Sequence, residues 1–156
     1  MASANNISSY DDSITLDGKE LRIALVVAEW NQAITDKLYQ GARETLLKHN
    51  VMAENIVKFN VPGSFELIYG ASQAQAQKFD VVIAIGCIIQ GETRHFEFIS
   101  NAVAHGIKDL NINGKSPVIF CVLTDDNVSQ SQARSGGKFG NKGVEAATAA
   151  LRMILL

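Results

Sequence analysis

Several features that mark other classes of protein are missing from this chain of 156 residues. No apolar run approaches the roughly 20 residues that span a bilayer, so we expect no contact with a membrane. The polar segment at residues 1–13 lacks the apolar core of a signal peptide, which favours a cytoplasmic protein. A net charge of −2 and the lack of a clustered basic face argue against binding to nucleic acid.

Cysteines and metal-binding patterns are also scarce. The two cysteines, Cys87 and Cys121, each lie within an apolar run typical of a strand. Free buried thiols are therefore favoured over a disulfide. The sequence has no C-x-x-C motif and no spaced set of histidines and cysteines, so it predicts no metal site.

What is present is an ordinary globular composition, with 47% apolar and 19% charged residues. We expect a flexible tail at residues 1–13 and one domain at residues 14–156. A short edge strand is possible at residues 13–18. Four apolar runs predict buried strands, at residues 21–30, 55–61, 80–89 and 117–124.

Segments with helical features follow these strands, at residues 31–50, 64–77, 95–111, 128–136 and 141–156. The alternation predicts an α/β fold of three layers, a doubly wound, flavodoxin-like sandwich around a four-stranded parallel sheet. Ligands of such sheets bind beyond the carboxyl ends of the strands. The residues that follow each strand are therefore the candidates for a functional site.

The first two strands end in aromatic and turn-forming residues. Trp30, the only tryptophan, precedes Asn31 and could be either a core residue or a ring that stacks on a planar ligand. Pro62 and Gly63 break the second strand, and Gly63 or Ser64 is expected near the cap of the next helix. This segment is either a turn with a capped helix or a ligand-binding rim with outward N–H groups.

The third strand runs into the sequence GCIIQGETRHFEF, residues 86–98. Gly91 permits unusual backbone conformations, and Glu92 and Thr93 precede a helix whose first N–H groups attract anions. His95 opens that helix, where the dipole disfavours the imidazolium and favours a neutral, proton-accepting ring. A surface histidine without a function is the alternative.

After the fourth strand, a capped helix start at residues 124–127 leads to the sequence RSGGKFGNKG. Arg134, Lys138 and Lys142 lie among its glycines, a combination that suits a phosphate. Neither the P-loop nor the dinucleotide-binding glycine motif is satisfied. A solvated loop between two helices is the alternative.

Taken together, VPGSFEL, GCIIQGETRHFEF and GGKFGNKGVEAA resemble the lumazine synthase family of riboflavin biosynthesis, in order and spacing, from about Leu21 onward. The resemblance implies a transferase that joins 5-amino-6-(D-ribitylamino)uracil to 3,4-dihydroxy-2-butanone 4-phosphate. A Schiff base forms, phosphate and water leave, and ring closure gives 6,7-dimethyl-8-ribityllumazine. No metal or organic cofactor takes part.

The resemblance also implies roles for individual residues. His95 is the proton carrier, and the phosphate is bound by Glu92, Thr93 and Arg134. Lys142 and Glu145 are possible supporting residues, with Glu145 orienting His95. The pyrimidine and its ribityl chain are held by Trp30, Asn31, Ser64, Phe65, Glu66, Cys87, Ile88, Ile89 and Phe120. Two positions depart from the family pattern, since Ile68 replaces a common proline and Gln90 replaces a basic residue of some members.

The family assembles as pentamers, and often as an icosahedral shell of 60 subunits, with Phe120 reaching a neighbour's site. An insertion associated with free fungal pentamers is absent, which favours the shell, and riboflavin synthase is a possible enclosed partner. The rival function is a flavodoxin-like module that binds a flavin or phosphate without catalysis. A phospho-acceptor receiver domain is rejected, because its acids are missing after the first and third strands.

Overall fold

The structure is a computed structural model that describes residues 17–156. The tail predicted at residues 1–13 lies outside this part. The edge strand expected at residues 13–18 falls mostly outside it too, and its last two residues, Asp17 and Gly18, belong to no strand.

A four-stranded parallel sheet forms the centre of the domain, as predicted. Its strands are β1 (Ile23–Ala28), β2 (Ile56–Val61), β3 (Val81–Ile89) and β4 (Val118–Asp125), in the order β2-β1-β3-β4. The two central strands are buried along most of their length because helices cover both faces. This burial explains why their sequences are continuous rather than alternating apolar runs.

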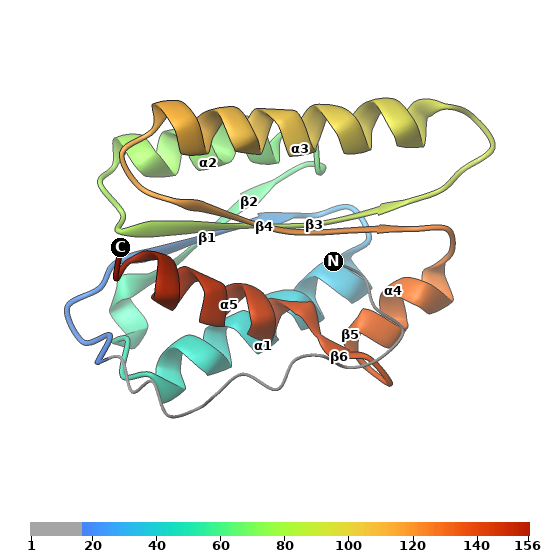
Figure 1. The fold of residues 1–156 in the computed structure, drawn as a ribbon. Coiled ribbons are helices and arrows are strands. Elements are labelled where there is room, and N and C mark those ends of the chain that lie inside the picture. Colours follow the sequence, from blue (N-terminus) through green and yellow to red (C-terminus); the bar gives the residue numbers. More distant parts are fainter. Residues whose placement is uncertain (1–16) are drawn as a thin grey trace.

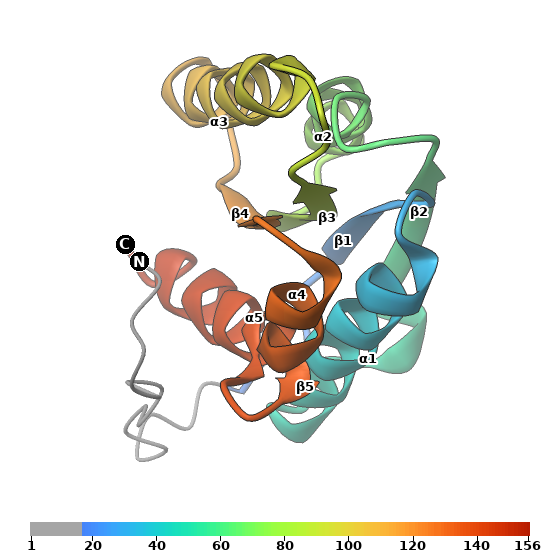
Figure 2. The same cartoon turned by 90° about the vertical axis from the view of Figure 1, so that its right-hand side faces the viewer.

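Two helical layers complete the sandwich (Figures 1 and 2). On one face, α1 (Gln32–Lys48) and α5 (Lys142–Met153) lie side by side. On the other face lie α2 (Leu67–Ala76) and α3 (His95–Asn113). Each layer has its own buried apolar cluster against the sheet, so the core is divided by the sheet into two halves. The described helices include none that is long and apolar enough to cross a membrane.

Two local predictions were wrong. The second helix starts at Leu67 rather than near Ser64, because Leu67 N–H and Ile68 N–H donate to Ser64 and Phe65 carbonyls in a tight turn. The short helix α4 (Val128–Arg134) does not extend to the glycines. They form an antiparallel hairpin instead, from β5 (Ser135–Gly137) and β6 (Gly140–Asn141). One 3-10 turn, η1 (Ala53–Asn55), precedes β2.

The G-N-K-G sequence, residues 140–143, packs the start of α5 against α1. Asn141 caps α5, since its side-chain oxygen accepts from Gly143 N–H at 2.8 Å, while its amide nitrogen donates to the Lys37 carbonyl at 2.8 Å. A Cβ at Gly143 would overlap the backbone of Leu38 on α1. These contacts give the asparagine and the glycine structural reasons for their positions.

Candidate active site

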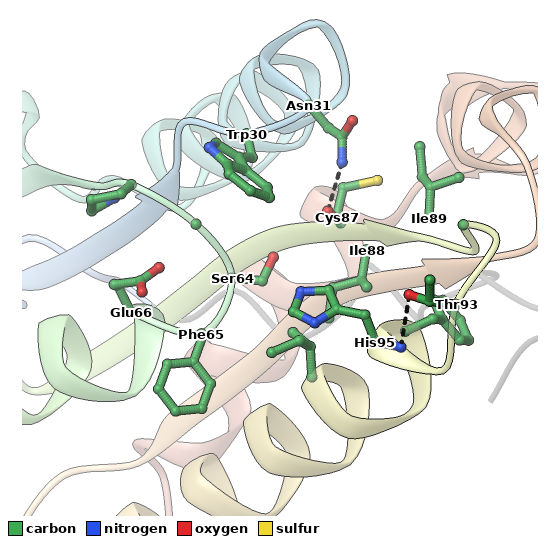
Figure 3. A pocket seen from close by; sticks show the side chains of 15 residues that line it. Trp30, Asn31, Ser64, Phe65, Glu66, Cys87, Ile88, Ile89, Thr93 and His95 are labelled. Atoms are coloured by element: carbon green, nitrogen blue, oxygen red, sulfur yellow. Dashed lines mark hydrogen bonds between the residues drawn. The ribbon is translucent and has the colours of Figure 1, made fainter.

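A hollow of about 530 Å³ lies at the carboxyl ends of β1, β2 and β3, and we call it the strand-end pocket. The chain leaves β1 toward α1 and leaves β3 toward α3, on opposite faces of the sheet. A crevice opens between adjacent strands at such a reversal. Its walls are Trp30, Asn31, Pro62, Gly63, Ser64, Phe65, Glu66, Cys87, Ile88, Ile89, Gly91, Thr93, His95, Phe96 and Ile99 (Figure 3).

Trp30 and Asn31 enter the strand-end pocket from the end of β1. The Trp30 side chain is 70% exposed, which excludes the core residue that the sequence left open. Asn31 has a left-handed backbone (φ 58°), a conformation that asparagine tolerates better than most residues. Its Nδ2 donates to the Cys87 carbonyl at 2.9 Å, so the amide ties the end of β1 to β3. Within residues 17–156 its side-chain oxygen accepts no hydrogen bond.

The turn after β2 forms a second wall. Ser64 is buried, whereas Phe65 and Glu66 are exposed at the rim. A Cβ at Gly86 of β3 would lie 2.7 Å from Ser64 Oγ and 2.9 Å from Leu67 Cδ1. The first glycine of GCIIQGETRHFEF therefore lets the turn and the start of α2 approach the sheet closely.

The segment between β3 and α3 closes the pocket. His95 is the first residue of α3, and its ring projects into the pocket near Ile88 (Figure 3). The His95 N–H donates to Thr93 Oγ1 at 3.4 Å. Gln90 Nε2 donates to the carbonyls of Gly91 and Thr93, at 2.6 and 3.5 Å. Gln90, one of the two residues that depart from the family pattern, thus stabilises this loop.

A second hollow of about 460 Å³ lies beside β4, and we call it the β4-edge pocket. It opens along an outer strand of the sheet, where Phe120 is 43% exposed. Its walls are formed by residues on both faces of β4, by the last residue of α4 and by the first two turns of α5. They are Ile119, Phe120, Cys121, Val122, Leu123, Thr124, Asp125, Arg134, Lys142, Glu145, Ala146 and Ala149. The two pockets have no residue in common.

Four charged side chains of the β4-edge pocket form two ion pairs. Lys142 Nζ donates to both oxygens of Glu145, at 2.6 and 2.8 Å. Arg134 Nη1 lies 3.8 Å from Asp125 Oδ1 and donates to the Gln130 carbonyl at 3.0 Å. The pocket therefore holds two cations, each balanced by a carboxylate.

Comparison with known proteins identifies the family. The sequence profile of the 6,7-dimethyl-8-ribityllumazine synthase family matches residues 20–156. The chain belongs to the lumazine synthase family. The proteins of that name from Christiangramia forsetii and Flavobacterium johnsoniae are 53% and 56% identical to it, over 97% and 98% of this chain and 92% and 82% of theirs. The lumazine synthase of Porphyromonas gingivalis is 50% identical over 98% of this chain and 96% of its own.

Membership of the lumazine synthase family confirms three predictions. The chain has the flavodoxin-like α/β fold of the family, and it is a transferase of riboflavin biosynthesis. Catalysis, rather than flavin binding alone, is its function.

The predicted lumazine synthase site residues are distributed unequally. The strand-end pocket brings together ten of them, from Trp30 to His95. The β4-edge pocket holds Phe120, Arg134, Lys142 and Glu145. Glu92 is exposed and lines neither pocket. Within residues 17–156, no cluster of three histidine, cysteine or acidic side chains could hold a metal ion.

Sequence reasoning did not single out Asp125 and Ser131. Both were assigned to a capped helix start or its helix, yet both side chains are buried. Asn127 alone makes the cap, through its Oδ1 and Gln130 N–H. The sequence did contain a sign that Asp125 could be buried. Asp125 and Asp126 directly follow an apolar strand, and of two adjacent side chains at a strand end one faces inward.

Proposed function

We propose that the strand-end pocket is the place where this enzyme condenses the ribitylaminouracil with the butanone phosphate. The observation that carries the proposal is the convergence of three strand ends on one hollow with aromatic, polar and imidazole walls. A flat ring, a polyol chain and a phosphorylated ketone need those three kinds of surface. The pocket is also large enough for a small-molecule ligand.

Each wall has a distinct role in this proposal. The exposed Trp30 ring stacks on the pyrimidine, and Cys87, Ile88 and Ile89 form the floor beneath it. Asn31 Oδ1, Ser64 and Glu66 hold the ribityl hydroxyls, with Phe65 at the rim. Thr93 lies near the phosphate. Holding both reactants in one orientation supplies most of the rate, because it replaces a bimolecular encounter by a positioned one.

His95 transfers protons between the reacting groups. The amine of the pyrimidine attacks the ketone carbonyl and water leaves, which gives a Schiff base. A proton must then leave carbon as the phosphate departs, and His95 in the pocket wall is placed to take it. The second amine closes the ring, with loss of a further water.

The β4-edge pocket of a neighbouring subunit completes the site. This proposal rests on the division of the predicted residues, since the phosphate-binding Arg134 and the ring-packing Phe120 lie apart from His95 in one chain. An edge strand with an exposed phenylalanine needs a covering partner. The neighbour's Arg134 then reaches the phosphate, while Lys142 and Glu145 support the pocket.

The assembly that follows is a ring of five subunits, built into an icosahedral shell of 60 in the cytoplasm. A head-to-tail contact between two different surfaces forms a closed ring when the rotation between neighbouring subunits closes. The two free buried cysteines suit a reducing compartment. Riboflavin synthase, which uses the product, is the proposed enclosed partner.

A subunit-mixing experiment tests the shared site. His95→Ala and Arg134→Ala chains, carrying different tags, are expressed together and purified through both tags. Random mixing gives intact sites at about a quarter of the interfaces, where an Arg134→Ala subunit offers its strand-end pocket to a His95→Ala neighbour. The fluorescence of the lumazine product measures the recovery, at a butanone phosphate concentration below the KM of the parent enzyme, where both separate variants are slow. Activity that stays at the level of the separate variants contradicts a site shared between subunits.

A further inference from the structure

Asp125 is the most deeply buried charged side chain among the described residues, at 6% exposure. It is the last residue of β4, and its backbone carbonyl accepts from Gln90 N–H at 2.9 Å. The strand end is therefore fixed against β3. A carboxylate in such a place is unfavourable unless charged or hydrogen-bonding partners surround it.

Both carboxylate oxygens of Asp125 have partners. Ser131 Oγ donates to Oδ2 at 2.8 Å, and Arg134 Nη1 lies 3.8 Å from Oδ1. Ser131 is itself fully buried, and its hydroxyl accepts from the Cys87 thiol at 3.4 Å. A chain of polar side chains thus runs inside the protein from Cys87, in the wall of the strand-end pocket, to Arg134.

Arg134 is held from three directions. Its Nη1 donates to the Gln130 carbonyl at 3.0 Å, its guanidinium carbon lies 5.1 Å from the centre of the Phe139 ring, and Asp125 faces Nη1. Its other N–H groups have no protein partner among the described residues. Because Arg134 lines the β4-edge pocket, those groups remain for an anion.

We propose that Asp125 is a positioning residue: held by Ser131, it fixes the Arg134 guanidinium in the orientation that binds the substrate phosphate. This inference rests on the proposed role of Arg134. The carboxylate contacts no reacting atom in this arrangement, and it acts through the arginine. A guanidinium that is already ordered loses less side-chain entropy when the phosphate arrives.

The variant Asp125→Asn keeps the shape of the side chain and removes its charge. We expect the KM for the butanone phosphate to rise about tenfold, the size typical for loss of one charge-assisted contact. The KM for the pyrimidine and kcat should change less than about twofold. Ser131→Ala, a smaller change in a buried site, should raise the same KM by a smaller factor. Asp126→Asn, the exposed neighbour, is the matched control and should leave all three constants unchanged.

A double variant separates positioning from a merely structural role. If Asp125 acts through Arg134, then Asp125→Asn adds nothing to Arg134→Ala. Effects that multiply in the double variant, or a KM for the butanone phosphate that is unchanged or lower in Asp125→Asn, overturn the proposal. The assembled enzyme is used throughout, and its mass is verified for each variant.

A last measurement does not depend on what Arg134 binds. Nitrogen-15 relaxation of the Arg134 Nε–H in the assembled enzyme reports the mobility of the side chain. We expect a rigid guanidinium in the parent protein and a mobile one in Asp125→Asn, with no change in Asp126→Asn. If Arg134→Ala does not raise the KM for the butanone phosphate, the proposed function of Arg134 fails while this readout still tests the positioning. An equally rigid guanidinium in Asp125→Asn overturns the positioning itself.

Discussion

At the scale of single residues, the strand-end pocket combines the imidazole ring of His95 with aromatic and polar side chains. His95 is the first residue of α3, and its backbone N–H donates to Thr93 Oγ1. The start of the helix therefore determines where the ring lies. In the proposed function, its contribution is a proton transfer added to a site that already aligns both substrates.

His95→Ala should therefore slow turnover strongly without abolishing it. General acid–base catalysis contributes roughly 100- to 10,000-fold, and we expect kcat to fall by about 100-fold, with small changes in both KM values. Steady-state assays of lumazine fluorescence measure this. His105→Ala, an exposed histidine on the same helix, is the control. An unchanged kcat in His95→Ala would remove His95 from the mechanism.

Arg134→Ala should raise the KM for the butanone phosphate by about tenfold or more and that for the pyrimidine much less, because it removes a charged phosphate contact. Lys138→Ala is a matched control, since Lys138 is an exposed cation in the following hairpin, outside both pockets. Each substrate is titrated while the other is saturating. Equal effects on both KM values would show that Arg134 does something other than bind phosphate.

The two thiols should be inert in the folded enzyme. Burial is the main cause that raises the pKa of Cys87, and it raises the pKa of Cys121 from 9.0 to about 12. At pH 8 only ~1 in 10,000 Cys121 side chains is then a reactive thiolate. Iodoacetamide labelling followed by mass spectrometry should find both thiols unmodified before unfolding and both modified afterwards.

The same shift gives Cys121 a pH-dependent effect on stability. The unfolded thiol loses its proton above pH 9.0, while the folded one keeps it up to about pH 12. Its contribution to stability is thus complete below pH 9.0 and is lost as the pH rises from there to about 12. The stability of Cys121→Ala should fall less steeply over that interval than that of the parent protein, as measured by denaturant unfolding. Parallel curves would contradict the raised pKa.

At the scale of elements, the contact between α1 and α5 depends on a glycine. A side chain at Gly143 would overlap the carbonyl of Leu38, and neither backbone can move without disturbing the Asn141 bridge. Gly143→Ala should lower the free energy of unfolding by about 2 kcal/mol or more. Guanidinium unfolding at one fixed protein concentration measures it.

Gly91→Ala is the comparison for that experiment, because a Cβ at Gly91 meets no atom within 4 Å. We expect its unfolding free energy to stay within about 0.5 kcal/mol of the parent value. If Gly143→Ala loses no more stability than Gly91→Ala, the overlap with Leu38 does not limit the stability of the fold.

The elements also show what a linear sequence can and cannot reveal. The run of branched apolar residues at 80–89 was sufficient to predict β3, since few structures other than a strand buried on both faces have such a sequence. The start of α2 was misplaced because the capping tendency of Ser64 is local, whereas its close contact with Gly86 is tertiary. The Gly-rich hairpin at β5 and β6 has no periodicity to recognise. Family resemblance supplied the site residues, but the division of those residues between two pockets depends on the order of the strands.

At the scale of the whole molecule, the exposed edge of β4 and the open strand-end pocket predict that activity follows assembly. Native mass spectrometry should find species of about five or about sixty times the 16.9 kDa chain. Dilution that dissociates them should abolish turnover. A fully active monomer would contradict the shared site, and a fully active free pentamer would contradict only the shell.

The separation of the two pockets within one chain has a consequence for how activity is counted. In the proposed shared site, each subunit contributes its strand-end pocket to one reaction and its β4-edge pocket to another. The number of working sites then equals the number of contacts, not the number of chains. A closed ring has as many contacts as subunits, whereas an open row has one fewer. In an isolated pair, one of the two pockets of each subunit is unused. In the proposed assembly, closing the ring therefore raises activity by more than one site, because the last subunit to join completes two sites at once.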